Sequence, residues 1–153
     1  MRRLLTVSLA AARLAITMPA GAAEFEVKML NKGEEGAMVF EPSLLKITLG
    51  DSVKFLAADK MHNAESIAGM IPEGEKKFAG KINEEITVTF ERPGIYGIKC
   101  LPHHGMGMVA MIVVGTPTNE EQARAVRVAQ SRRSVPFAGS QIAEADILAS
   151  HRE

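Results

Sequence analysis

Between residues 24 and 115, apolar side chains recur at every second position, and turn residues interrupt the pattern. In the first such stretch Phe25, Val27 and Met29 alternate with charged residues, which predicts a strand with one buried face. The apolar positions of the further predicted strands are Leu45, Ile47 and Leu49; Val53 and Phe55; Ile86, Val88 and Phe90; and Tyr96, Ile98 and Cys100. Several short strands with no long helical pattern between them indicate an all-β protein, an antiparallel sandwich or barrel.

Two stretches within this region depart from simple alternation. Residues 108–114 are apolar almost throughout, which predicts a final strand covered on both faces. Residues 57–81 contain three glycines and a proline and predict a long connection with one helical turn. The region 23–115 is therefore expected to form one β-sandwich domain.

The character of the sequence changes after residue 117. The segment beginning Thr118-Asn119-Glu120-Glu121 predicts a helix that starts near residue 119, with acidic residues in its first turn and arginines towards its end. Val135-Pro136 ends this helix, and Ser140 is the expected cap of a second short helix that runs to about residue 150. Because short helices are marginal alone, we expect residues 116–153 to form a helical extension, two short C-terminal α-helices packed on the sandwich.

The first 22 residues have the composition of a secretory signal peptide. They combine a charged start at Arg2 and Arg3, an apolar middle and an A-x-A-like exit at Ala20 and Ala22. An N-terminal core helix is the alternative, but the abrupt change to a strand-like sequence at Glu24 disfavours it. We therefore expect cleavage after Ala22 and export of the mature chain.

Composition and charge exclude several classes of protein. The chain has 153 residues and a formal net charge of zero, which fits one domain with a small appendage and lacks the basic excess of nucleic-acid-binding proteins. After residue 25 no apolar run approaches the ~20 residues of a membrane span. Cys100 is the single cysteine, so no internal disulfide is expected, and after export its thiol would need shielding by burial or by a metal.

The most informative segment runs from Cys100 to Met108, between the last two predicted strands. A loop there places a thiolate, an imidazole and a thioether around one point, and two His, one Cys and a distant Met are typical of blue-copper sites. The candidates for the imidazoles are His62, His103, His104 and His151. His151 lies near the end of the sequence and the adjacent His103 and His104 cannot easily both bind, so His62 is the natural partner of one of them.

Each donor taken singly also has a purely structural interpretation. A lone Cys that alternates with Ile98 is usually a small core residue, and single methionines usually fill cores. Together, in an exported protein, these residues favour a metal site. Zinc is the weaker candidate, because structural zinc usually takes four Cys or His ligands and Met is a poor fourth ligand.

From Glu24 to Gly115 the sequence resembles the pseudoazurins, small periplasmic type 1 (blue) copper proteins of the cupredoxin family. The matching stretches are Met29-Leu30-Asn31-Lys32-Gly33, Met38-Val39-Phe40-Glu41-Pro42, His62-Asn63-Ala64-Glu65-Ser66-Ile67, Met70-Ile71-Pro72-Glu73-Gly74, Lys81-Ile82-Asn83-Glu84, Lys99-Cys100-Leu101-Pro102-His103 and Met106-Gly107-Met108. The resemblance implies a cupredoxin-type Greek-key β-sandwich and a periplasmic location. A helical tail also suits pseudoazurins, although the residue-level similarity there is weak.

The resemblance also implies one copper ion per chain that cycles between Cu(I) and Cu(II). The implied ligands are three equatorial residues and one long axial methionine: His62, Cys100, His103 and Met108. His104 and Met106 stay unbound, and His104 stands where relatives often have a bulky aromatic residue. The resemblance also implies a role for Asn63, which is not itself a ligand. It would link the two ligand loops and place a backbone N–H near the Cys100 sulfur, and such a contact tunes the reduction potential of copper.

Such a site leaves no ligand position open for a substrate, so the sequence predicts an electron carrier and no enzyme. By resemblance its partners are transient redox proteins of a denitrifying chain: copper nitrite reductase, nitrous-oxide reductase or a c-type cytochrome. The implied docking residues near the copper end are Lys32, Lys60 and Lys99. Simple solubilising charge is an equally weighted interpretation of these lysines.

The sequence alone is also compatible with three other functions. A periplasmic copper carrier or storage protein would use the same donors, although such proteins usually expose Met-rich or Cys-x-x-Cys segments. A thiol enzyme using Cys100 with His103 requires an exposed thiolate of low pKa. A sandwich that binds a protein ligand would keep Cys100 merely as a buried core residue.

Overall fold

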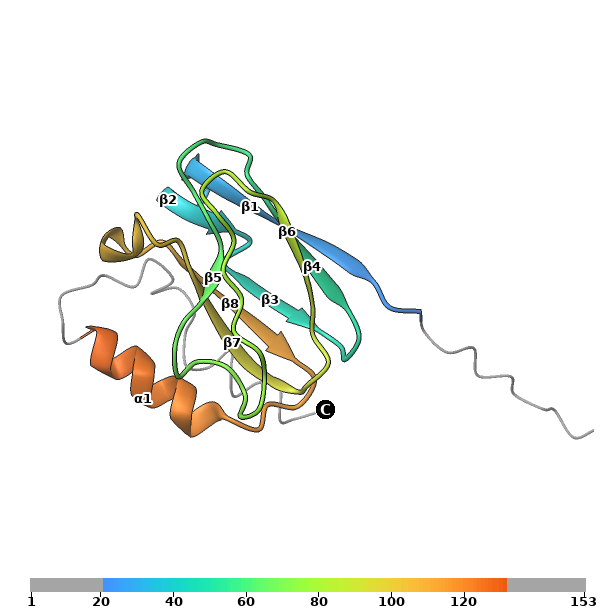
Figure 1. Cartoon of the computed structure of the whole chain (residues 1–153). Coiled ribbons are helices and arrows are strands. Elements are labelled where there is room, and N and C mark those ends of the chain that lie inside the picture. The colour runs from blue at the N-terminus through green and yellow to red at the C-terminus, as the bar shows by residue number, and fades with distance from the viewer. Residues whose placement is uncertain (1–20, 132–153) are drawn as a thin grey trace, which may run out of the picture.

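The computed structural model describes residues 21–131 of the chain. The expected signal segment up to residue 20 and the expected second helix after Ser140 lie outside the described residues. In this part of the chain eight strands form two four-stranded sheets that face each other, and the α-helix α1 (Glu120–Ser131) lies to the side (Figure 1). The chain is therefore mainly β, as its alternation predicts.

Each sheet combines strands from distant parts of the sequence. The first sheet has the order β2-β1-β4-β6, formed by β2 (Gly36–Glu41), β1 (Glu24–Gly33), β4 (Ser52–Leu56) and β6 (Ile86–Thr89). The second has the order β3-β8-β7-β5, formed by β3 (Leu44–Ile47), β8 (Val109–Val114), β7 (Gly94–Lys99) and β5 (Glu65–Ser66).

Two of the strand pairs are parallel, which corrects the expectation of an antiparallel arrangement. β1 runs parallel to β4, with Phe25 opposite Val53, and β3 runs parallel to β8, with Leu45 opposite Ile112. The chain crosses to the second sheet at β3 and returns at β4, which places β4 beside β1 in the same direction. Alternation reports which face of a strand is buried and carries no information about strand direction.

The main core lies between the two sheets and contains the residues that alternation assigns to it. Phe55 is fully buried with its ring between those of Phe40 and Phe78, at centroid distances of 6.3 and 6.2 Å. Cys100 and Met108 belong to the same cluster. Leu49 is an exception, because it lies beyond the end of β3 and is 52% exposed.

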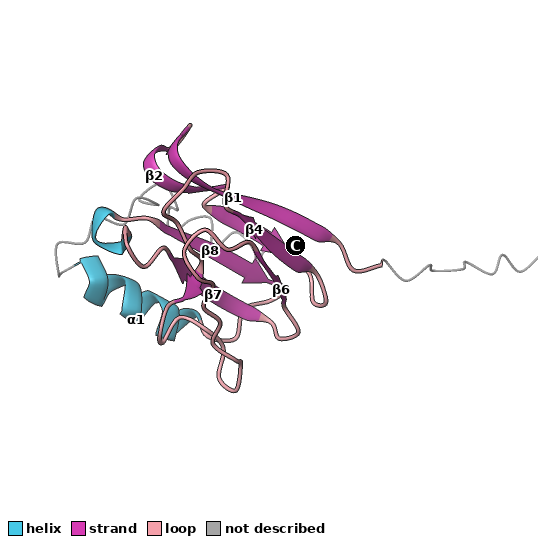
Figure 2. Ribbon diagram, turned by 45° about the horizontal axis from the view of Figure 1, so that its top comes forward, coloured by secondary structure: helices cyan, strands magenta, loops and turns pink. Residues whose placement is uncertain are grey.

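A second apolar layer covers the outer face of β7 and β8. Helix α1 lies beside β7 and contributes Ala123 and Val126 to this layer (Figure 2). Ile67 and Met70 of the long connection belong to the same layer, so β8 has apolar residues packed against both faces and all of its residues are buried. The side chain of Asn119, just before α1, accepts the N–H of Ile95 at 2.7 Å and donates to its carbonyl oxygen at 3.0 Å. This amide fastens the start of the helix to β7, as a neighbouring strand would.

The long connection of residues 57–81 contains the short strand β5 and no helical turn, so that part of the expectation is wrong. Tyr96 links the connection to β7, since its single hydroxyl proton is shared between Glu75 Oε2 at 3.2 Å and the Arg92 carbonyl oxygen at 2.9 Å. Within residues 21–131, no helix has the length and hydropathy that a membrane span requires.

Candidate metal centre

One tight loop brings three of the sequence-predicted site residues together. Cys100 follows β7, the 3-10 helix η1 (His104–Met106) comes next, and Met108 immediately precedes β8. The Cys100 N–H donates to the Met108 carbonyl oxygen at 3.1 Å, and the Met108 N–H donates to the His103 carbonyl oxygen at 3.2 Å. Gly107 has a φ of 88°, which reverses the chain between them. Local backbone bonds therefore hold this loop closed.

The structure places His62, from the connection after β4, against this loop. Cys100 Sγ lies 3.7 Å from His62 Nδ1 and 3.4 Å from His103 Nδ1, and the two Nδ1 atoms are 3.1 Å apart. Donor atoms that share one metal ion through bonds of about 2.0–2.3 Å have separations of this size. Among residues 21–131 this is the one group of at least three His, Cys, Asp or Glu side chains placed to hold an ion.

The orientation of His62 follows from its other ring nitrogen. His62 Nε2 lies 2.9 Å from Asn31 Oδ1, an oxygen that can only accept, so Nε2 carries the proton. Nδ1 then presents a lone pair towards Cys100 and His103. Asn83 fixes the backbone here, because its Oδ1 accepts the Met61 N–H at 2.6 Å and its own N–H donates to the His62 carbonyl oxygen at 2.8 Å.

Burial dominates the electrostatics of the donors. It raises the pKa of the Cys100 thiol, an effect that hydrogen bonds from the backbone at Asn63 and His103 oppose. Burial also lowers the pKa of His62, with a further lowering from His103 and an opposing effect of Asp59. The neutral imidazole is the form that binds a metal, so the site favours the ligating state of His62.

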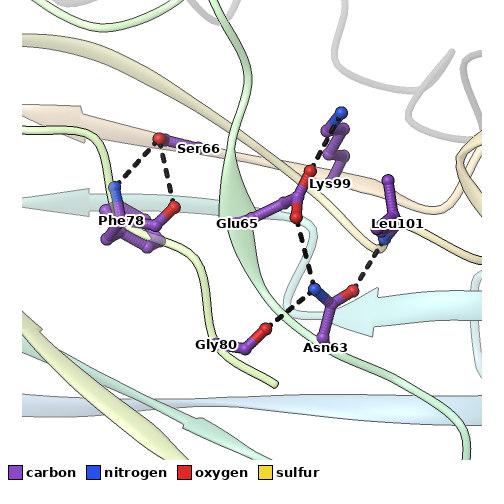
Figure 3. A network of polar contacts seen from close by, with 7 residues as sticks. All are labelled: Asn63, Glu65, Ser66, Phe78, Gly80, Lys99 and Leu101. Atoms are coloured by element: carbon purple, nitrogen blue, oxygen red, sulfur yellow. Dashed lines mark hydrogen bonds and ion pairs between the residues drawn. The ribbon is translucent and has the colours of Figure 1, made fainter. Parts of the chain in front are cut away.

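A polar network links the two ligand-bearing segments (Figure 3). Asn63 Oδ1 accepts the N–H of Leu101 at 2.7 Å, and Asn63 Nδ2 donates to the Gly80 carbonyl oxygen at 3.0 Å and to Glu65 Oε2 at 3.4 Å. Glu65 Oε1 in turn pairs with Lys99 Nζ at 2.9 Å. The residue after His62 therefore holds the residue after Cys100, and a carboxylate paired with a lysine supports it.

Replacing Asn63 by Ala is expected to lower the free energy of unfolding by about 2–3 kcal/mol, since the N–H of Leu101 and the carbonyl of Gly80 lose a buried partner. We also expect copper affinity to fall about 10–100-fold, the range for outer partners of metal ligands. Urea denaturation and competition with a copper chelator measure the two effects.

Ser66→Ala is the matched control for this variant. Ser66 lies on β5, and its hydroxyl bonds the N–H and the carbonyl oxygen of Phe78 without touching the ligand loop (Figure 3). This variant should lose stability and keep its copper affinity. Equal affinity losses in both variants would mean that Asn63 acts only through general stability.

Comparison with known proteins places this arrangement in a family. Residues 27–115 match the family model of copper-binding proteins of the plastocyanin/azurin type. The chain is 49% identical over 125 residues to pseudoazurin from Paracoccus pantotrophus, an alignment that covers 81% of this chain and 86% of that protein. The chain belongs to the plastocyanin/azurin family, among the pseudoazurins.

Solved structures agree with this membership. Pseudoazurin from Methylobacterium extorquens AM1 is 46% identical with a TM-score of 0.67, over 76% of this chain and 98% of that one. A pseudoazurin from Sinorhizobium is 43% identical with a TM-score of 0.71, over 80% and 98%. The fold is thus the cupredoxin fold, and the chain is an electron carrier with a copper site rather than an enzyme.

The burial of Cys100 also argues against the alternative of a thiol enzyme that uses Cys100 with His103. Such an enzyme requires an accessible thiolate of low pKa. Cys100 is 0% exposed, and its pKa is raised. The side chain is therefore placed to be a ligand rather than a nucleophile.

The two methionines of the ligand loop have opposite environments. Met108 is fully buried in the core cluster that contains Cys100, whereas Met106 is 54% exposed. His104 is half-buried, and its Nε2 is buried without a hydrogen-bond partner. The remaining histidine, His151, lies outside the described residues.

Sequence reasoning did not assign a role to Asn31, Asn83 or Glu65. Asn31 is an exposed residue near the end of β1 and Asn83 is an exposed turn residue, and asparagines in and near turns usually serve the turn itself. Their positions near His62 depend on pairing between segments about 20 to 30 residues apart, at Asn83 and Asn31 respectively. The signal available in the sequence was their presence within the stretches that resemble pseudoazurins.

Proposed function

We propose that His62, Cys100 and His103 are the equatorial ligands of one copper ion and that Met108 is its long axial ligand. We further propose that the chain is exported to the periplasm and there carries single electrons to a denitrification reductase such as copper nitrite reductase. Nitrous-oxide reductase and c-type cytochromes are the other partners that the resemblance suggests. These assignments extend the family membership to named residues and partners.

The observation that carries the proposal is the triangle of donor atoms with separations of 3.1, 3.4 and 3.7 Å. The donor set itself selects copper, because one thiolate, two imidazoles and a weak thioether suit Cu(I) and Cu(II) alike. The bond to Asn31 leaves His62 with the correct nitrogen free. Of the two methionines in the ligand loop, Met108 is the one that is fully buried, in the cluster that contains Cys100.

Bound copper supplies a one-electron couple, and the chain supplies a site that barely rearranges. The hydrogen bonds of Asn31, Asn63 and Asn83 restrain both ligand-bearing segments, and burial keeps water from Cys100 and His62. His103 is the partly exposed ligand, so electrons would pass between the copper and the surface through its ring.

The surface around His103 suits a brief redox encounter. Met61 and Leu101 are each 58% exposed and Met106 is 54% exposed, which gives this end of the molecule an apolar character. Small apolar contacts of this kind are typical of transient electron-transfer complexes. Lys32 and Lys60 are exposed and available for steering an acidic partner.

Lys99 differs from the other two lysines, because its ammonium pairs with Glu65 at 2.9 Å. We expect Lys32→Gln and Lys60→Gln to slow association with copper nitrite reductase severalfold at low salt and to flatten the salt dependence. Lys99→Gln removes a charge that Glu65 already offsets, so its effect should be smaller. Stopped-flow rates over a series of salt concentrations measure all three variants, and equal effects would contradict this ranking.

The test of the function is reconstitution of the purified chain with one equivalent of Cu(II). A strong visible thiolate-to-copper band, lost on reduction and restored on oxidation, is expected, followed by electron delivery to copper nitrite reductase. A copper carrier or storage protein would instead exchange metal faster than electrons. The burial of Cys100, His62 and Met108 disfavours such exchange.

A further inference from the structure

A buried carboxylate directly before the inner strand β4 accepts hydrogen bonds from neutral donors. Asp51, in the turn between β3 and β4, is 5% exposed. Its Oδ2 accepts the N–H and the hydroxyl of Thr48, both at 2.8 Å, and its Oδ1 accepts the N–H of Ala23 at 2.8 Å. These bonds lower the pKa of Asp51, so the group is negative at neutral pH. Buried charges are normally paired with an opposite charge, and none of these three donors carries one.

Ala23 is also the point at which the first strand becomes attached to the rest of the sheet. Besides the bond from its N–H to Asp51, its carbonyl oxygen accepts the N–H of Ser52 at 2.9 Å. The two residues before it, Gly21 and Ala22, are exposed, and no atom lies within 4 Å of the position that a Cβ on Gly21 would take. Ala23 is thus the first residue that hydrogen-bonds to the sheet, and the Ala22–Ala23 peptide bond directly before it is the bond where the sequence predicts cleavage.

We propose that cleavage of this bond converts the Ala23 N–H into an α-ammonium group that forms an ion pair with Asp51, so that maturation completes the fold. The inference rests on the export proposed above. Water is the co-reactant and a signal peptidase the catalyst. The bond between the Ala22 carbonyl carbon and the Ala23 nitrogen breaks, the carbonyl carbon takes the water oxygen and leaves as a carboxylate, and the nitrogen keeps the electron pair of the broken bond and receives both protons of the water. An α-amino group is largely protonated at neutral pH, and an adjacent carboxylate strengthens this preference.

The geometry indicates that this ion pair increases the stability of the folded chain. One N–H already points at Asp51 Oδ1 at hydrogen-bond distance, so the ammonium needs no rearrangement. Ala23 is exposed, so the other hydrogens of the ammonium remain in water and the desolvation penalty of the cation is small. The carboxylate is buried before and after cleavage, and a hydrogen bond between charged partners is about twice as strong as one between neutral groups.

The decisive experiment compares three chains that carry copper and differ only at the N-terminus. The first begins at Ala23 with a free amine, the second is the same chain acetylated at Ala23, and the third begins at Ala22. We expect the first to melt about 2–5 °C above the other two. In the Asp51→Asn background this difference should vanish. Equal melting temperatures of the three chains with Asp51 intact would overturn the proposal.

The reactivity of the amine gives a readout that does not depend on the Asp51 variant folding. Acylation by an activated ester requires the free amine, so the ion pair should slow modification of the Ala23 amine about tenfold relative to the amine of the chain that begins at Ala22. Mass spectrometry measures both rates, and equal rates would overturn the pairing. N-terminal sequencing of the exported protein should give Ala23, and a different start would overturn the inference while leaving the copper spectrum and the electron-carrier function intact.

Discussion

Cys100→Ser is expected to abolish the visible absorption of the copper-loaded protein and its electron transfer to a partner. Cys100 Sγ lies 3.7 Å from His62 Nδ1 and 3.4 Å from His103 Nδ1, so it completes the group of donor atoms. A serine oxygen cannot replace it, because it is neither a soft donor nor an anion at neutral pH. The side chain is fully buried, so no nearby water-exposed donor can take its place without opening the core. Optical spectra after Cu(II) addition and stopped-flow electron transfer measure the loss.

Met106→Leu is the matched control for the loss of Cys100. Met106 lies in the same loop, but it is 54% exposed and is not one of the proposed ligands. This variant should keep its colour and its electron transfer. A coloured, active Cys100→Ser protein would overturn the copper assignment, and a colourless Met106→Leu protein would overturn the choice of Met108 as the axial ligand.

Gly94→Ala is expected to give the largest loss of stability, about 3–5 kcal/mol in the free energy of unfolding. Gly94 is buried at the start of β7 with a φ of 155°. A Cβ at this position would overlap the Cγ of Pro72 and lie 2.9 Å from Asn119 Oδ1. Because the proline ring is rigid and the amide of Asn119 bonds Ile95, relief of the overlap would loosen the start of α1 from the sheet.

Urea denaturation measures this loss, and Gly105→Ala is the control. Gly105 is exposed, and no atom lies within 4 Å of the position of its added Cβ, so this change should be nearly neutral. The copper spectrum of folded Gly94→Ala protein should stay unchanged, since Gly94 and Cys100 lie at opposite ends of β7, about 20 Å apart for an extended strand. Equal stabilities of the two alanine variants would show that Pro72 moves aside at little cost.

The resemblance groups Lys32, Lys60 and Lys99 as expected docking residues, and the structure gives one of them a different environment. Lys99 is the partly exposed last residue of β7, and its ammonium contacts Glu65 because β5 pairs with β7 at that register. Lys32 and Lys60 have exposed side chains. The difference depends on which strand lies beside β7, and strand partners are not encoded in the spacing of charges along one segment.

The amino-acid sequence alone determined which residues face the core and which donors share a loop. Val27, Phe55 and Ile98 alternate with polar or smaller neighbours, and a two-residue period assigns a face wherever a strand forms. The short spacing from Cys100 to Met108 likewise restricts those donors to one turn of chain. Both features are local, so they can be recognised without knowledge of the rest of the molecule.

The tertiary structure was needed for every feature that joins distant segments. The parallel pairing of β1 with β4, the proton on His62 that Asn31 fixes, and the bond from Ala23 to Asp51 each join residues about 30 positions apart. Such contacts depend on how the sheets assemble, and no short period in the sequence records them. The donors are thus recognisable from their spacing, whereas their orientation and their charged surroundings come from packing.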